Sequence, residues 1–213
     1  IRADWRLPLL FLTLCVFTLS DQGQVISGEY NQVLSIGDDA PAWKDLPGVD
    51  DETHSLADLK DKKAIVVVFT CNSCPVAMDY EDRIVAFANQ FAAKDSDVAL
   101  IAINVNKIEE DAFPQMKVRA KEKGFTFPYL FDESQKIAKD YGAGYTPEFF
   151  VLNRDRKIVY MGAMDDDTDP AKAQTNYIQL AVDAAIKGEK PETTETIPVG
   201  CRIRFARERK KSS

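Results

Sequence analysis

The chain has 213 residues, a net charge of −7 and four cysteines, and these values already restrict what it can be. A chain of this length can bury one substantial hydrophobic core, and two full domains would be cramped. The negative charge argues against nucleic acid as the main partner. The basic residues near the C-terminus are too few to change this, and we interpret them as a solvated tail: Arg202, Arg204, Arg207, Arg209, Lys210 and Lys211.

The first twenty residues differ in character from the rest of the chain. Arg2 and Arg6 precede an apolar run at positions 9–19, and polar residues follow it. A basic start with an apolar run of this length is typical of a secretory signal, whereas a membrane-spanning helix needs about 20 apolar residues. We therefore expect residues 1–20 to be a signal peptide of an exported, extracytoplasmic and most simply periplasmic protein. A membrane tether is the alternative, and residues 21–35 read as a polar leader.

Downstream of this leader, short β-branched runs alternate with longer amphipathic stretches. The pattern predicts buried strands at 65–69 and 98–103, a hairpin of strands 149–152 and 157–161, and helices at 74–93, 112–123, 134–141 and 171–187. A linker rich in Thr, Glu and Pro at 189–198 leads to residues 199–205. Apolar and basic residues alternate there, which predicts a short edge strand that docks on the domain.

This order of elements predicts an α/β fold. Buried strands that alternate with helices favour a three-layer α/β/α sandwich around a mixed central sheet, with its first strands parallel and the hairpin at one edge. We assign one domain to residues 36–188, and the linker, C-terminal strand and basic tail to 189–213.

The motif that carries chemistry is Cys71-Asn72-Ser73-Cys74, which follows a buried apolar run and opens an amphipathic stretch. A thiolate at the start of a helix is stabilised by unpaired backbone N–H groups and by the helix dipole. A second cysteine one turn further on can resolve a mixed disulfide formed by the first. Pro75 is tolerated only near the first turn of a helix, so it places the helix start here. The pattern predicts a redox-active dithiol.

With this motif after one strand and Thr146-Pro147 before a later one, the chain resembles the thioredoxin fold. More narrowly, it resembles the redoxin branch, which is grouped with alkyl hydroperoxide reductase and thiol-specific antioxidant and with related extracytoplasmic thioredoxins. The resemblance covers residues 36–187, and its matching segments are residues 36–41, 69–75, 141–143 and 145–148.

This resemblance implies a thiol-disulfide oxidoreductase in which Cys71 is the exposed nucleophile and Cys74 the resolving thiol. It also implies that Pro147, preceded by Thr146, is cis, faces the dithiol and offers backbone to an extended substrate. The implied partners are protein or small thiols and disulfides, together with a reducing or oxidising partner protein. We expect neither a cofactor nor a resident metal.

Two departures from the family pattern matter. A peroxiredoxin-type peroxidase needs Pro-x-x-x-Thr-x-x-Cys, but Val66 stands at the proline position and Cys74 lies four residues beyond Thr70. An antioxidant peroxidase is therefore kept as an alternative. Many extracytoplasmic thioredoxins place a Glu three residues after the second cysteine, where this chain has Ala77. Glu81 is then the candidate proton acceptor, and a solvated surface carboxylate is the competing interpretation.

The other alternative is a redox-inert thioredoxin-fold module that binds a partner or handles copper. Copper chaperones of this fold use two thiolates and a downstream histidine, but the one histidine, His54, lies upstream in a polar segment. The acidic run at 165–169 lacks the spacing of a calcium loop, and we expect it to cap a helix that begins at Ala171.

Cys201 is left over once the CxxC pair is assigned and the signal segment is removed. An odd cysteine in an exported protein suggests a reactive thiol or an alternative disulfide partner. We take Cys201 as a candidate third redox cysteine for the Cys71/Cys74 pair, and the alternative is a half-buried cysteine that fills a small apolar site.

Overall fold

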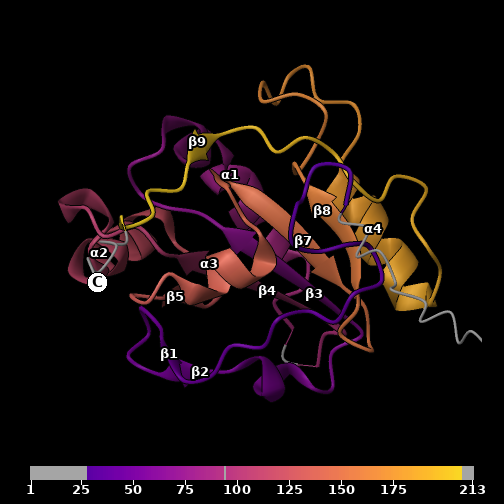
Figure 1. Ribbon diagram of the computed structural model, residues 1–213, viewed down its shortest axis with the longest axis horizontal. Coiled ribbons are helices and arrows are strands. Elements are labelled where there is room, and N and C mark those ends of the chain that lie inside the picture. Colours follow the sequence, from indigo (N-terminus) through magenta and orange to yellow (C-terminus); the bar gives the residue numbers. More distant parts are fainter. Residues whose placement is uncertain (1–27, 94, 208–213) are drawn as a thin grey trace, which may run out of the picture.

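The structure is a computed structural model that describes residues 28–93 and 95–207. The signal peptide expected at residues 1–20 lies outside this range. Figure 1 shows a central sheet with helices on both sides, so the three-layer α/β/α architecture is confirmed. No helix within the described ranges is long and apolar enough to cross a membrane.

The central sheet is mixed and has five strands in the order β5-β4-β3-β7-β8. The strands are β3 (Ala64–Phe69), β4 (Val98–Asn104), β5 (Tyr129–Phe131), β7 (Glu148–Leu152) and β8 (Ile158–Gly162). β4 runs parallel to β3 and β5, whereas β7 runs antiparallel to β3 and β8. Every residue of β3 is buried, as expected for a continuous apolar strand at the centre of a sheet covered on both faces.

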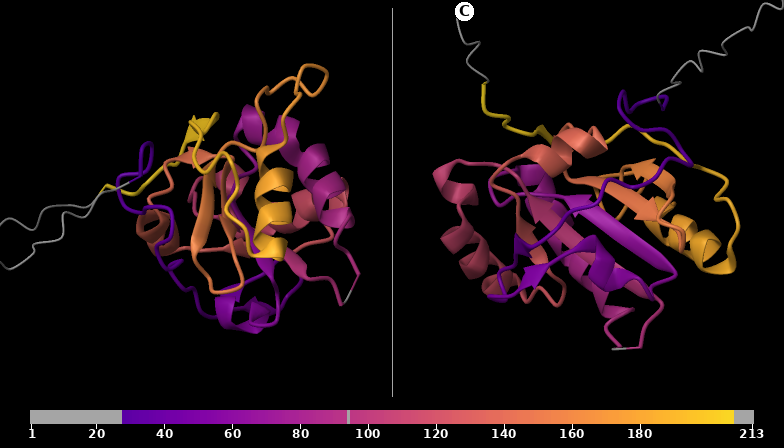
Figure 2. Two further views of the ribbon diagram at one scale, coloured as in Figure 1. Left: turned by 90° about the vertical axis from the view of Figure 1, so that its right-hand side faces the viewer. Right: turned by 60° about the horizontal axis from the view of Figure 1, so that its bottom comes forward.

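Four helices pack on the sheet: α1 (Pro75–Asn89), α2 (Phe113–Lys123), α3 (Lys136–Tyr141) and α4 (Tyr177–Lys187). Residues of α1, α2 and α4 share one hydrophobic cluster with one face of β3, and α3 shares the other cluster with the opposite face. The left view of Figure 2 shows α1 and α4 on the same side of the sheet. Gly124 and Gly142 end α2 and α3 with positive φ, a conformation that favours glycine.

The predicted helix at 171–187 is too long, because α4 begins only at Tyr177. The Asn176 side chain caps it by accepting the N–H of Gln179 at 2.9 Å. Just before the cap, the Asp166 carboxylate accepts the N–H groups of Gln174 (2.9 Å) and Thr175 (3.1 Å), which holds this stretch in a turn. The acidic run therefore organises a loop, and it does not cap a helix at residue 171.

The segments on either side of the assigned domain pack against it. In the stretch expected to be a leader, the Asn31 amide donates to the carbonyl oxygen of Tyr141 at 2.8 Å. In the expected linker, the Thr194 carbonyl oxygen accepts the Met161 N–H, and the Thr196 N–H donates to the Met161 carbonyl oxygen, each at 3.0 Å. Both stretches therefore extend the packed unit beyond residues 36–188.

Aromatic rings fill the core beneath the carboxyl end of β3. Phe69, Tyr141 and Phe150 form three edge-to-face pairs with centroids 5.1–5.8 Å apart. Such pairs contribute beyond the area they bury, and they fix β3, β7 and α3 relative to each other.

We expect Phe150→Ala to lower the free energy of unfolding by about 3–5 kcal/mol, because the side chain is fully buried and its removal leaves a cavity beside the rings of Phe69 and Tyr141. Urea unfolding followed by circular dichroism measures this. Val118→Ala, at an exposed position on α2, is the matched control and should change stability by less than about 0.5 kcal/mol. A Phe150→Ala loss as small as that of the control would contradict the packing argument.

Candidate active site

The CxxC motif forms the loop between β3 and α1 (Figure 1). Cys74 is the N-cap of α1, its sulfur accepts the Ala77 N–H at 3.4 Å, and Pro75 takes the first helical position as predicted. Cys71 lies outside the helix, so the expectation that Cys71 itself occupies the helix start is wrong. The helix N-terminus acts on Cys74 because the proline allows the helix to begin only after it.

The Thr146–Pro147 peptide bond is cis, and it lies beside the dithiol as expected. The Cys74 thiol donates to the carbonyl oxygen of Thr146 at 2.9 Å. The sulfur of Cys71 is 3.4 Å from the Thr146 hydroxyl oxygen. One buried residue therefore contacts both sulfurs.

Both cysteines of the motif are buried, with Cys71 3% and Cys74 1% exposed. The expectation of an exposed Cys71 nucleophile is therefore wrong for this conformation. Two donors face the Cys71 sulfur, the Thr146 hydroxyl and the Cys74 backbone N–H. The Ser73 hydroxyl is 3.7 Å away, but it donates its one proton to Asp111. The two donors can stabilise a thiolate at Cys71 once it forms.

A buried carboxylate, Asp111, holds the loop in place. It accepts the Ser73 N–H at 2.8 Å and the Ser73 hydroxyl at 2.7 Å, and it also accepts from the Asn106 amide at 3.0 Å. Asp111 ends a short 3₁₀ turn, Glu109–Asp111, that follows β4. Sequence reasoning missed this residue, because nothing in an acidic triplet indicates which member turns inward.

The electrostatic setting of the two thiols differs. Burial raises the pKa of Cys71, and the negative charge of Asp111 adds to that increase. Burial also opposes ionisation of Cys74, but hydrogen bonds from the Cys201 side chain and the Ala77 N–H outweigh it and lower the pKa of Cys74. The pKa values of the two thiols therefore shift in opposite directions.

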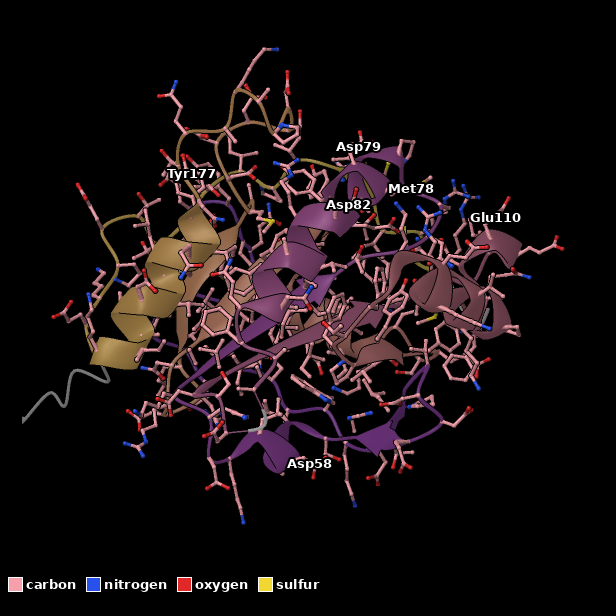
Figure 3. The ribbon with its side chains drawn as sticks, turned by 180° about the vertical axis from the view of Figure 1, so that it is seen from behind. Asp58, Met78, Asp79, Asp82, Glu110 and Tyr177 are labelled. Atoms are coloured by element: carbon pink, nitrogen blue, oxygen red, sulfur yellow. The ribbon has the colours of Figure 1, made fainter. Side chains whose placement is uncertain are left out.

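Glu81 has a different role from the one expected. It is buried, and its two carboxylate oxygens accept from the Arg119 guanidinium at 2.7 Å each, so it is not a solvated surface residue. Lys123 lies 3.4 Å away as a second cation. The exposed acidic residues of α1 are Asp79 and Asp82, both labelled in Figure 3. Because Glu81 is held in a paired, partly buried network, we do not retain it as a proton acceptor.

Glu148, directly after Pro147, is a second buried carboxylate that the sequence did not reveal. Its Oε2 accepts the N–H groups of Gly144 (2.8 Å) and Tyr145 (2.9 Å), which fixes the chain before the cis bond. Burial raises the pKa of Glu148 to about 7, and the two hydrogen bonds oppose that increase.

The C-terminal segment docks on the domain, as the alternating pattern predicted. Strand β9 (Cys201–Arg202) pairs antiparallel with β6 (Tyr145–Thr146). Ile203 is buried behind it and donates its N–H to Gly144 at 2.9 Å. Cys201 is exposed, so the interpretation as a half-buried cysteine in an apolar site is wrong.

The remaining candidates lie outside this arrangement. His54 belongs to a small hairpin of β1 (Leu46–Pro47) and β2 (Thr53–His54), where its Nε2 contacts the Asp50 carboxylate at 2.9 Å. Asp165 of the acidic run is buried and accepts from Tyr80 at 2.7 Å and Arg83 at 2.5 Å. Within residues 28–93 and 95–207, no group of three or more potential ligands could hold a metal ion.

Comparisons with known proteins show the family to which the chain belongs. A family model described as Redoxin matches residues 35–177. A putative peroxiredoxin of Mycobacterium tuberculosis is 28% identical over 142 residues, which span 59% of this chain and 83% of that protein. The thiol-disulfide oxidoreductase ResA of Bacillus anthracis is 28% identical over 130 residues, with 59% and 68% covered.

Two solved structures are similar over a larger share of this chain. A hypothetical protein of Sinorhizobium meliloti is 33% identical with a TM-score of 0.75, and the match covers 83% of this chain and 97% of that one. An uncharacterized conserved protein of Geobacillus kaustophilus is 34% identical with a TM-score of 0.74, covering 86% and 96%. A putative thioredoxin of Neisseria meningitidis, 22% identical with a TM-score of 0.55 over 70% of this chain and 92% of that one, shares the fold.

We expect Asp111→Asn to lower the pKa of Cys71, because the substitution removes a negative charge that disfavours the thiolate. The pH dependence of Cys71 alkylation by iodoacetamide measures this in a background where Cys74 and Cys201 are serine. Asp155→Asn, in the exposed turn after β7, is the control and should leave the profile in place. An unchanged or raised Cys71 pKa in Asp111→Asn would contradict this account of the site.

A second prediction concerns Glu148 and pH. Between its ordinary pKa of 4.5 and its native value of about 7, the folded carboxyl keeps a proton that the unfolded chain releases. The free energy of unfolding therefore falls as pH rises through this window, by about 1.4 kcal/mol for each pKa unit that separates the two states. Glu148→Gln should flatten that decline, because the amide oxygen can still accept both N–H groups.

Urea unfolding at pH 4.5, 6 and 8 tests it, with the pH values spanning the native pKa of about 7. Glu133→Gln, at an exposed position, should keep the wild-type slope. An identical pH dependence in wild type and Glu148→Gln would show that Glu148 does not titrate in this range.

Proposed function

This chain belongs to the redoxin family, and from that premise we propose that it is an extracytoplasmic thiol-disulfide oxidoreductase that cycles Cys71 and Cys74 between dithiol and disulfide. Its substrates are thiols and disulfides of proteins or small molecules. The observation that carries the proposal is the convergence of both sulfurs on Thr146, directly before the cis proline.

The chemistry follows from the environment of each sulfur. Cys71 first loses its proton to solvent, with the Thr146 hydroxyl and the Cys74 N–H facing the resulting thiolate. This thiolate attacks one sulfur of a substrate disulfide, and the other substrate sulfur leaves as a thiolate. Cys74, whose pKa is lowered, then attacks the Cys71 sulfur and releases the second substrate thiolate. The Cys71–Cys74 pair is oxidised by two electrons, and the substrate disulfide is reduced to two thiols.

Pro147 and Thr146 act as positioning residues in this proposal. Thr146 contacts both sulfurs. Glu148, which follows the cis bond, fixes the backbone that precedes it by accepting the N–H groups of Gly144 and Tyr145. Such support keeps the reacting groups at productive distances and limits their rotation.

Peroxide is the second candidate oxidant, because one of the similar proteins is named a putative peroxiredoxin. In that reaction a thiolate attacks a peroxide oxygen to give a sulfenic acid, and the second cysteine displaces water to form the same disulfide. The absence of the peroxiredoxin pattern around Thr70 favours disulfides as the main substrates. Peroxide consumption measured beside disulfide reduction ranks the two.

Export is proposed from the basic start and apolar run of residues 1–20. Fractionation of cells that express the full-length protein, with mass spectrometry of its N-terminus, tests this part. An uncleaved protein confined to the cytoplasm would contradict it.

The central prediction is that wild-type protein reduces insulin disulfides in the presence of dithiothreitol, whereas Cys71→Ser and Cys74→Ser fall to the uncatalysed rate. The reason is that each variant lacks one sulfur of the pair. An Asp155→Asn protein, changed far along the chain from the CxxC loop, serves as the folded control. Wild-type protein without turnover would instead favour the redox-inert module.

The order of attack is tested separately in variants that lack Cys201. With Cys74 also replaced by serine, a disulfide substrate should accumulate as a mixed disulfide on Cys71, because no thiol remains to resolve it. With Cys71 replaced, Cys74 should react more slowly, because its sulfur is held between the Thr146 carbonyl oxygen and the Ala77 N–H at the start of α1. Peptide mapping identifies the adduct. Faster trapping on Cys74 would reverse the assigned roles.

A further inference from the structure

Cys201 lies at the same backbone junction as the CxxC pair, although it is far away in the sequence. In the β6–β9 ladder its register partner is Thr146. The Thr146 carbonyl oxygen accepts from Cys74, and the Thr146 hydroxyl is 3.5 Å from the Cys201 carbonyl oxygen. Figure 1 shows β9 beside α1, and Cys74 is the N-cap of that helix.

Cys201 and Cys74 lie on adjoining elements, because β9 contacts α1 and pairs with Thr146, whose carbonyl oxygen accepts from Cys74. Their hydrogen bond is the largest cause that raises the pKa of Cys201, to about 11, and it also helps to lower the pKa of Cys74. The Val76 N–H, in the first turn of α1, points at the Cys201 sulfur as well. The third thiol is therefore in position to react with the second.

The three thiols differ sharply in access. Cys71 and Cys74 are 3% and 1% exposed, whereas Cys201 is exposed. Cys201 is therefore the most accessible of the three sulfurs to a reductant that approaches this conformation. The surface therefore offers one sulfur of this cluster to a partner.

We propose that Cys201 is a third redox thiol, which takes the disulfide from the buried Cys71–Cys74 pair and presents it to the reducing partner at the surface. This inference rests on the proposed function, because the Cys71–Cys74 disulfide is its starting species. The partner is a thiol or dithiol, either a protein or a small molecule.

The exchange balances without an added oxidant. The Cys201 thiolate attacks the Cys74 sulfur, the Cys74–Cys201 bond forms, and the Cys71–Cys74 bond breaks. Cys71 leaves and takes up the proton that Cys201 lost. Its raised pKa makes it hold that proton. In the Cys71–Cys74 disulfide the Cys74 sulfur cannot ionise, so the interaction with Cys74 that raises the pKa of Cys201 in the reduced site is removed and Cys201 becomes a better nucleophile.

The partner then reduces the Cys74–Cys201 disulfide at the protein surface. A partner thiolate attacks the exposed Cys201 sulfur, and Cys74 leaves as a thiolate that the Ala77 N–H stabilises. A leaving thiol with a low pKa departs faster, which favours attack at this end of the bond. A second partner thiol resolves the mixed disulfide, so Cys201 returns as a thiol and the partner is oxidised.

Gly200 allows the close approach that this exchange requires. A Cβ at this position would lie 2.1 Å from the Thr146 carbonyl oxygen, so any side chain would push β9 away from the cis-proline loop. Gly200→Ala therefore displaces Cys201 and keeps all three thiols, which separates the position of Cys201 from its presence.

Disulfide mapping is the first test. Cys71→Ser protein, treated with one equivalent of diamide, should form a Cys74–Cys201 disulfide within one chain, and adding Gly200→Ala should lower its yield several-fold. Arg204→Ser, an exposed change on the same segment, is the matched control and should leave the yield unchanged. If diamide produces no Cys74–Cys201 disulfide within one chain, or only disulfides between two chains, the proposal is overturned.

Kinetics is the second test. Oxidised Cys201→Ser should be reduced by glutathione at pH 7 about ten-fold more slowly than oxidised wild type, because attack must then occur on a buried sulfur. Arg204→Ser should keep the wild-type rate. If wild type turns over insulin but Cys201→Ser is reduced as fast as wild type, this inference alone is wrong. If wild type forms no Cys71–Cys74 disulfide at all, the proposed function fails with it.

Discussion

Thr146 is the residue on which the arrangement of the site depends. Its carbonyl oxygen accepts from Cys74, and its hydroxyl lies 3.4 Å from the Cys71 sulfur. In the pairing of β6 with β9, it lies opposite Cys201. The sheet supplies this position, because the β3–β7 register sets Phe69 opposite Glu148 and so brings the end of β3 beside the cis-proline loop. A one-residue slip in that register would turn these side chains to the opposite face.

Burial and neighbouring charge then determine how readily each thiol of the pair ionises. Asp111 fixes the CxxC loop through Ser73, but its charge also disfavours a thiolate at Cys71. A disulfide carries no charge, so it avoids the repulsion and desolvation that a buried thiolate meets. The helix N-terminus and the Cys201 side chain stabilise charge at Cys74 instead. The site therefore separates a thiol that resists ionisation from one that accepts it.

Local patterns predicted the α/β fold and the redox-active dithiol, and the family resemblance added the cis proline beside it. The apolar run of β3, Pro75 after the CxxC motif, and Thr146-Pro147 before β7 each report a constraint that acts within a few residues. The burial of individual carboxylates and the start of α4 could not be predicted in this way. Asp111 turns inward toward a distant partner, Ser73, and Glu81 pairs with Arg119, which joins α1 to α2. Glu148 bonds N–H groups only three and four residues away, but it does so across the cis bond. The start of α4 was misplaced because side chain–backbone bonds at Asp166 override helix propensity.

The central claim is that Cys71 and Cys74 form a reversible redox pair. The most direct measurement is a titration of the purified protein against buffers of reduced and oxidised glutathione, with the Cys71–Cys74 disulfide quantified by peptide mapping after acid quenching and thiol alkylation. The account predicts one reversible two-electron transition, with the same midpoint approached from the reduced and the oxidised side. Thiols at Cys71 and Cys74 that remain free at every glutathione ratio, or a disulfide that no ratio reduces, would contradict it.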